Sequence, residues 1–99
     1  MLAFFLPGRR IARAGTPVEW RLYVAANAAA NAEIEIEVAA PGGAASAARV
    51  GRAVPAGGSA YRLTLATAQI DPGSYDVTLR LRSGGKVVAE DRHRIGVLP

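Results

Sequence analysis

Three glutamates that alternate with apolar residues are the densest group of potential metal ligands in this sequence. Glu33, Glu35 and Glu37 stand two residues apart in the run Ala-Glu-Ile-Glu-Ile-Glu-Val. In an extended strand this spacing places the carboxylates on one face, about 7 Å apart. That separation is too wide for compact calcium coordination without further ligands from loops. We therefore expect the glutamates to form cross-strand ion pairs, and we expect no metal site.

The single histidine belongs to a second group that could do chemistry. Asp91 and His93 would share one face of a regular strand, where an acid–base pair or metal ligation is the chemistry to consider. No third ligand or nucleophile is suggested near them, so we interpret His93 as structural. Because the chain has no cysteine, disulfides and thiolate chemistry are excluded. The run Gly84-Gly85-Lys86 lacks the Ser or Thr of a phosphate-binding loop. The sequence predicts no enzyme activity, no catalytic residue and no cofactor.

Basic residues gather near both ends of the chain. The 12 Lys and Arg residues exceed the 8 Asp and Glu residues, and Lys86 is the only lysine. If the first and last strands are neighbours, the two clusters form one basic patch that could bind a polyanion. Exposed aromatic residues for base stacking are scarce, and a net charge of +4 is ordinary for a soluble domain. Nucleic acid is therefore not expected, and polyanion binding stays an alternative. The patch consists of Arg9, Arg10, Arg13, Arg92 and Arg94.

Alternation of apolar and polar residues indicates strands along most of the chain. The clearest strands are expected at residues 18–24, 32–38, 61–65, 75–82 and 86–98, with a weaker one at 49–54 and another at the N-terminus. Clusters of Gly and Pro separate these runs. Loops are expected at 25–32 and 44–48, a hairpin turn at 83–85, and a bulge near Glu90 or Asp91.

These elements predict a single all-β domain over residues 1–99. About seven strands with short turns favour an antiparallel Greek-key sandwich, with a barrel as the alternative. No apolar run reaches the length of a membrane span.

One local motif resembles a known structural feature. Asp71, Gly73, Tyr75 and Val77 follow the pattern Asp-x-Gly-x-Tyr-x-hydrophobic. The pattern resembles the tyrosine corner of immunoglobulin-like (Ig-like) domains, in which the tyrosine hydroxyl bonds to backbone upstream. The match is to the broad bacterial Ig-like and fibronectin-III-like class and not to antibody domains. Both cysteines of antibody domains are missing, and Trp20 lies on the second alternating strand, whereas antibody domains carry their core tryptophan on the third. The resemblance implies a β-sandwich and favours an extracytoplasmic location (periplasm, cell surface or secreted).

Ig-like wiring makes a specific prediction about the glutamates. It places the third and sixth strands side by side and antiparallel. Glu33, Glu35 and Glu37 would then face Arg80 and Arg82 on the outer face of the sheet, and opposite charges across strands stabilise that pairing. Trp20 is expected in the core.

The N-terminal strand is the best candidate for contact with another molecule. Phe4 and Phe5 are consecutive, so an extended strand shows one ring to each face. Either one ring packs in the core and the other lies under a loop or a neighbouring domain, or the strand pairs with another molecule. The leading hypothesis is a non-catalytic interaction module of a bacterial envelope or secreted protein, with a protein as partner. The alternatives are self-assembly through Phe4 and Phe5, as a dimer or filament, and polyanion binding by the basic patch.

Overall fold

The computed structural model describes residues 1–8, 10–40, 43, 45–68 and 70–99. Within these residues the chain forms eight β-strands and no helix, which confirms the all-β class. The strands are β1 (Leu2–Pro7), β2 (Ile11–Arg13), β3 (Val18–Ala26), β4 (Ala30–Ala39), β5 (Ala45–Val54), β6 (Gly57–Leu65), β7 (Gly73–Ser83) and β8 (Lys86–Leu98).

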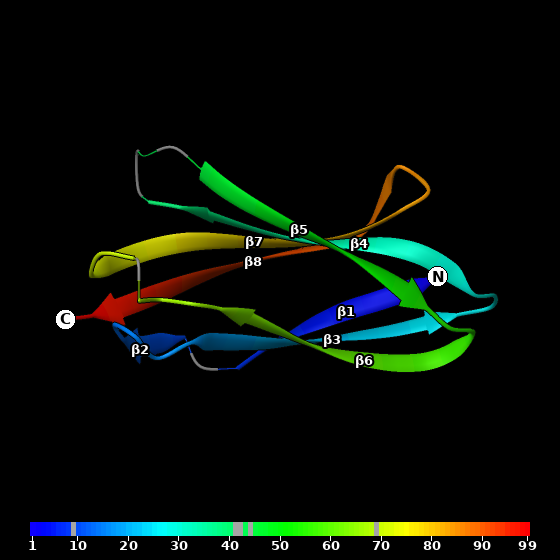
Figure 1. Ribbon diagram of the computed structural model, residues 1–99, viewed down its shortest axis with the longest axis horizontal. Helices are drawn as coiled ribbons and strands as arrows, with labels where there is room; N and C mark the ends of the chain where they lie inside the picture. The colour runs from blue at the N-terminus through cyan, green and yellow to red at the C-terminus, as the bar shows by residue number, and fades with distance from the viewer. Residues whose placement is uncertain (9, 41–42, 44, 69) are drawn as a thin grey trace.

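The strands form two sheets that lie face to face (Figure 1). The smaller sheet has the order β1-β3-β6, and the larger has the order β2-β8-β7-β4-β5. The larger sheet curls like half a barrel. Each ladder between the described strands is antiparallel, as expected, except that of β2 with β8, which is parallel.

The N-terminal segment changes from one sheet to the other at Pro7 and Gly8. Before this point β1 pairs with β3, and after it β2 pairs with β8. The Gly8 amide donates a hydrogen bond to the Glu19 carbonyl oxygen at 3.1 Å. A Cβ on residue 8 would lie 2.6 Å from that same oxygen, so only glycine fits there. The N-terminal strand therefore pairs within its own chain.

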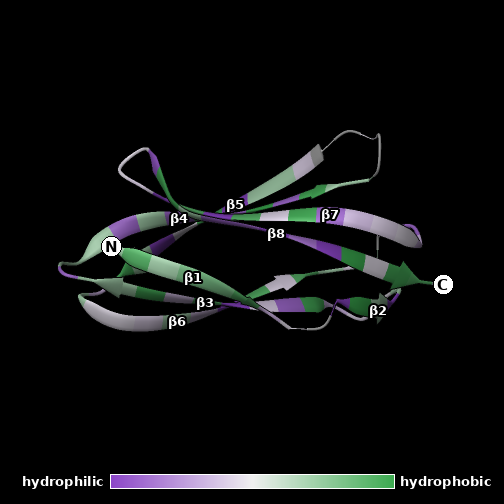
Figure 2. Cartoon of the chain, turned by 180° about the vertical axis from the view of Figure 1, so that it is seen from behind, coloured by the Kyte–Doolittle hydropathy of each residue, from purple (hydrophilic) through white to green (hydrophobic). Residues whose placement is uncertain are grey.

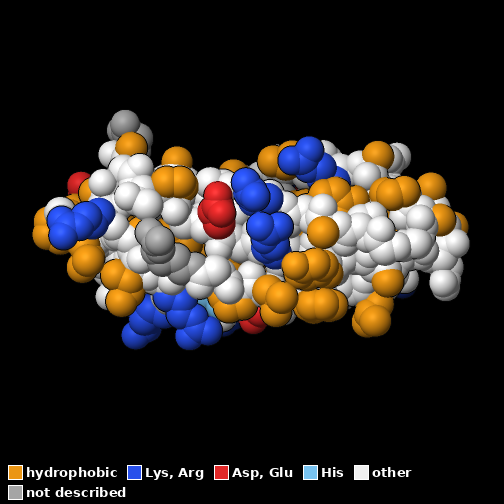
Figure 3. Space-filling view, turned by 90° about the horizontal axis from the view of Figure 1, so that it is seen from below, with side chains coloured by type: hydrophobic (Ala, Val, Ile, Leu, Met, Phe, Trp, Pro, Cys, Tyr) orange, Lys and Arg blue, Asp and Glu red, His pale blue; other side chains and the backbone are white. Residues whose placement is uncertain are grey.

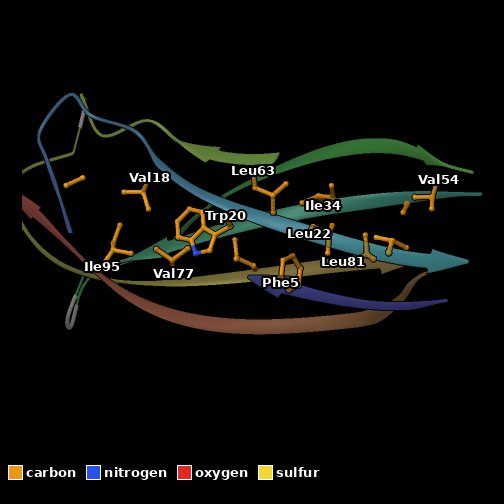
Figure 4. Packing of buried hydrophobic residues seen from close by; sticks show 14 of the residues in the cluster. Phe5, Val18, Trp20, Leu22, Ile34, Val54, Leu63, Val77, Leu81 and Ile95 are labelled. Atoms are coloured by element: carbon orange, nitrogen blue, oxygen red, sulfur yellow. The ribbon is translucent and has the colours of Figure 1, made fainter. Parts of the chain in front are cut away.

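The core lies between the two sheets and is centred on Trp20 (Figure 4). Trp20 is 1% exposed, as expected from the sequence. Alternate residues of β3 point inward, and alternate residues of β7 meet them from the larger sheet, so the period of two places large apolar side chains on both inner faces. The buried hydrophobic residues of these two strands are Val18, Trp20, Leu22, Val24, Ala26, Val77, Leu79 and Leu81.

The turn between β7 and β8 is the two-residue hairpin that the sequence predicted. Ser83 pairs with Lys86, and Gly84 and Gly85 form the loop between them. Their φ angles are +59° and +76°, which glycine adopts without strain and which match a type I′ turn.

The expected bulge is present, but at a different position. The register of β7 against β8 shifts between Leu81 and Arg82, which leaves Val88 without a partner. The prediction near Glu90 or Asp91 was therefore wrong by two to three residues. The two adjacent valines break the alternation, so the extra residue is accommodated there, before the charged residues begin.

Strand pairing also replaces most of the two loops expected from the sequence. β5 takes up residues 45–48 of the segment 44–48, of which residue 44 lies outside the described part. β3 continues to Ala26 and β4 begins at Ala30, which shortens the loop expected at 25–32. These segments consist mainly of alanine, which carries little sign of alternation, and their strand structure is set by the neighbouring strands.

Candidate functional site

The outer face of the smaller sheet carries an apolar stripe along β1. Leu2, Phe4 and Leu6 are 73%, 53% and 47% exposed, whereas Phe5 is 6% exposed. The rings of Phe4 and Tyr23 stack with their centroids 5.3 Å apart. Figure 2 shows hydrophobic colouring over most of β1, although β1 is an edge strand. We call Leu2, Phe4 and Leu6 the β1 stripe, and exposed apolar groups of this kind mark interaction surfaces.

A shallow hollow adjoins the β1 stripe on the same face. Its floor is formed where Ala25 of β3 faces Gly58 of β6 and where Tyr23 faces Ala60. Phe4 and Tyr23 are large, whereas Ala25, Gly58 and Ala60 are small. The hollow is therefore walled on the β1 side and remains shallow toward β6.

Two arginines lie on the same face as this hollow, two residues along the strands from Tyr23 and Ala60. Arg21 of β3 stands directly opposite Arg62 of β6, and both are exposed. No ion pair between described residues involves either of them. Like charges directly opposite each other destabilise a sheet. Figure 3 shows the molecule from this side, with hydrophobic side chains next to basic ones.

The outer face of the larger sheet has a different character, because its charges neutralise one another. A row of alternating charges crosses four neighbouring strands, with each residue directly opposite the next. Its members are Glu90 of β8, Arg80 of β7, Glu35 of β4 and Arg49 of β5. We call these four residues the charge row. Arg80 donates to Glu90 and to Glu35, each at 2.7 Å, and Arg49 Nε donates to Glu35 Oε2 at 2.6 Å.

The charge row places a carboxylate out of contact with solvent. Glu35 is 2% exposed. The hydrogen bond from Arg80 lowers the pKa of the Glu35 carboxyl below its usual value, and Arg49 adds to this effect, although burial opposes it. The hydrogen bonds to Glu35 and Glu90 raise the pKa of the Arg80 guanidinium. Glu35 is therefore ionised, paired and structural.

The glutamates lie where the sequence placed them, beside the arginines of β7. Glu33 faces Arg82 and Glu35 faces Arg80, which confirms the predicted pairing. Glu37 lies 3.3 Å from Arg80. The sequence did not reveal the other two members of the charge row, Glu90 and Arg49. A strand was expected at 49–54, but its pairing with β4 and the register of β8 against β7 were not predicted.

The two basic clusters lie along one edge of the larger sheet. The parallel pairing of β2 with β8 brings Arg10 and Arg13 alongside the end of the strand that carries Arg92 and Arg94. Arg94 pairs with Asp76 at 3.2 Å, and Arg92 lies 3.9 Å from Glu90. Arg9 lies outside the described residues. The basic patch is thus interrupted by carboxylates.

His93 points toward the core. Its side chain is 7% exposed, and its ring centroid lies 6.4 Å from that of Trp20. Its Nε2 atom is 3.2 Å from Asp91 Oδ2. Among the described side chains, no group of three or more His, Cys, Asp or Glu residues is placed to hold a metal ion. The pair packs against the core at the edge of the sandwich.

The residues of the Asp-x-Gly-x-Tyr motif lie at the start of β7. The Tyr75 hydroxyl donates a hydrogen bond to the Asp71 carbonyl oxygen. Gly73 has a φ of +153°, and Val77 is fully buried. The motif thus ties the entry of β7 to the loop before it.

One buried polar residue was missed by the sequence analysis. Thr67, which is 1% exposed, donates to the Thr16 carbonyl oxygen at 2.7 Å and accepts from the Gly15 amide at 3.0 Å. It joins the loop after β6 to the loop before β3. A single threonine between alanines gives no signal of this role in the sequence.

No family model, curated protein or solved structure matches this chain. Across the described residues there is also no helix long and apolar enough to cross a membrane.

Proposed function

We propose that this chain is an Ig-like Greek-key sandwich that acts as a non-catalytic module for protein–protein contact. The observation that carries the proposal is the β1 stripe, three large apolar side chains exposed on one face of one strand.

The strand order supports the Ig-like assignment. The order β8-β7-β4-β5 corresponds to the G-F-C-C′ order of variable-type Ig sheets, and β1-β3-β6 corresponds to A-B-E. The first strand divides between the sheets, and the Tyr75 hydroxyl bonds to the Asp71 carbonyl as a tyrosine corner requires.

The energetics of the outer faces support a contact function on the smaller sheet. Burying a Leu or Phe side chain contributes about 1.5–3 kcal/mol, so the β1 stripe is a source of binding free energy that the isolated chain leaves unused. On the larger sheet the charge row is already paired. Its exposed apolar residues do not form a stripe along one strand, because they are divided among β2, β5 and β8: Ile11, Val50, Val87 and Leu98. We therefore assign the contact surface to the outer face of β1, β3 and β6.

Site-specific photocrosslinking in the cells that produce the protein tests this function. p-Benzoylphenylalanine replaces Phe4, and in a matched control it replaces Ala47, which is exposed on β5 of the other sheet. We expect a discrete crosslinked protein from position 4 and none from position 47. Equal crosslinking from both positions, or none from position 4, would reject the proposed surface.

Self-assembly is the second candidate, because the β1 stripe could also meet another copy of itself. The structure limits which residues would take part. Phe5 is buried in the core and cannot form a contact without disrupting it. The interacting residues would be Phe4, Leu2 and Leu6, and the pair Phe4 and Phe5 expected from the sequence reduces to Phe4.

A further inference from the structure

We infer that the free edge of β6 pairs with an extended segment of a partner protein, which carries a carboxylate opposite Arg62 and a large apolar side chain opposite Ala60. This inference rests on the proposed contact function and names the surface and the chemistry of its partner.

The proposed binding site is the outer edge of β6. Within the described part of the chain, β6 pairs with β3 on one side and with no strand on the other. The strand has nine residues and contains no proline. Its outer backbone amides and carbonyls are therefore available to an added strand, the mode of recognition in which main-chain hydrogen bonds supply the affinity.

Two positive charges lie beside this edge. Arg62 stands beside Arg21, and in the described structure neither is paired with a carboxylate. An added strand would place one of its residues opposite Arg62 on the other side. A carboxylate there would attract Arg62 and offset the repulsion between Arg21 and Arg62. Positive and negative side chains would then lie side by side, as they do in the charge row of the larger sheet.

The shape of the hollow also bears on the partner. Ala60 lies two residues before Arg62, on the same face, and it forms the floor of the hollow beside Tyr23. A large apolar side chain opposite Ala60 would lie over this floor, near the stacked rings of Phe4 and Tyr23. Because side chains on one face repeat every two residues, the partner segment carries the apolar and the acidic residue two positions apart.

The same charges argue against a second copy as the added strand. The sequence of β6, Gly-Gly-Ser-Ala-Tyr-Arg-Leu-Thr-Leu, contains no carboxylate. Pairing two β6 edges would bring a second Arg62 to this face without neutralising the first. The other long edge strand, β5, is less suited to an acidic segment. Its Arg49 is already bound to Glu35, and its Arg52 stands opposite Ala32, so that a carboxylate there would relieve no repulsion. The structure thus favours β6 and a different protein.

A synthetic nine-residue peptide tests the inference. The peptide carries Leu and Glu two positions apart on one face of an otherwise alternating Thr/Val sequence. It is titrated into the isotopically labelled protein, and amide shifts and hydrogen exchange are followed by NMR. We expect saturable binding, with exchange protection along residues 57–65. No binding, or protection along residues 45–54 instead, would overturn the inference.

Charge reversal provides the decisive control. Arg62→Glu removes an exposed positive charge that Arg21 of β3 repels. We therefore expect the variant to retain the fold. We expect it to weaken binding about tenfold, because an attractive pair becomes a repulsive one. A peptide with Lys in place of Glu should bind Arg62→Glu better than the unaltered protein. Arg52→Glu, on β5, should change nothing. Equal affinity of Arg62→Glu and the unaltered protein would overturn the inference. If position 4 still crosslinks a partner, that result leaves the proposed contact function intact.

Discussion

Glu35 is the one charged side chain that is buried among the described residues. It is almost fully buried and accepts hydrogen bonds from Arg80 and Arg49. Glu35→Gln keeps the shape but removes the charge, so we expect a loss of about 2 kcal/mol in the free energy of unfolding at pH 7. Urea denaturation followed by Trp20 fluorescence measures this loss.

The pH dependence of this effect follows from the lowered pKa of Glu35. A carboxyl with a lower pKa in the folded state adds stability above its unfolded pKa near 4.5, and that stability is lost as the pH falls through the folded pKa. The difference between Glu35→Gln and the unaltered protein should therefore be full at neutral pH and shrink below about pH 4. Glu33→Gln, at a more exposed position, is the control and should show little change. A difference that is constant from pH 7 to pH 3 would contradict the assignment.

Tyr75 offers a second test at the residue scale. Tyr75→Phe removes the hydroxyl that bonds to Asp71 and should cost about 1 kcal/mol. Tyr61 is a matched control, since its hydroxyl makes a longer bond of 3.4 Å to the Ala53 carbonyl. We expect Tyr61→Phe to cost less in the same thermal or urea denaturation. Equal costs would mean that the bond at the start of β7 has no special role in the fold.

At the scale of the element, β1 separates stability from binding on its two faces. Phe5→Ala opens a cavity in the core and should cost about 3–4 kcal/mol. Phe4→Ala removes only an exposed ring that stacks on Tyr23 and should cost about 1 kcal/mol or less. Denaturation of both variants checks the contrast. Similar losses would mean that β1 does not present alternate faces to core and solvent.

The elements also show what the sequence could predict. Strands with one buried and one polar face, such as β3 and β4, are recognisable in the sequence because apolar and polar residues alternate. The glutamates of β4 and the arginines of β7 also predicted that these two strands pair. β5 showed this pattern only weakly. A strand was expected at 49–54, and residues 46–53 are mostly small or polar and are exposed on both faces. Its strand structure comes from pairing with β4, which no local pattern encodes.

The candidate surface was predictable only in part, for the same reason. Two consecutive phenylalanines in a strand imply one exposed ring, and Phe4 is that ring. The hollow and the arginine pair depend on the register between β3 and β6, which brings together residues about forty positions apart. Arg21 and Arg62 have no relation in the sequence that would mark them as neighbours.

At the scale of the whole molecule, the two outer faces differ in how far their interactions are completed within the chain. The larger sheet pairs its charges across four strands, so a partner would have to compete with existing ion pairs. The smaller sheet leaves apolar side chains, two like charges and a strand edge unpaired among the described residues. We therefore expect partner proteins to bind to the smaller sheet and not to the outer face of the larger sheet.

This asymmetry predicts the oligomeric state. A second copy offers β6 no carboxylate, and stacking the smaller sheets about a twofold axis that runs along the strands would place Arg21 against Arg21. We expect size-exclusion chromatography with light scattering to give a mass of 10.3 kDa that does not change with concentration. A mass that rises with concentration, and returns to 10.3 kDa in Phe4→Ser, would make self-assembly through the β1 stripe the function to explain. Phe4→Ser is the informative variant because it alters the exposed ring and leaves Phe5 in the core.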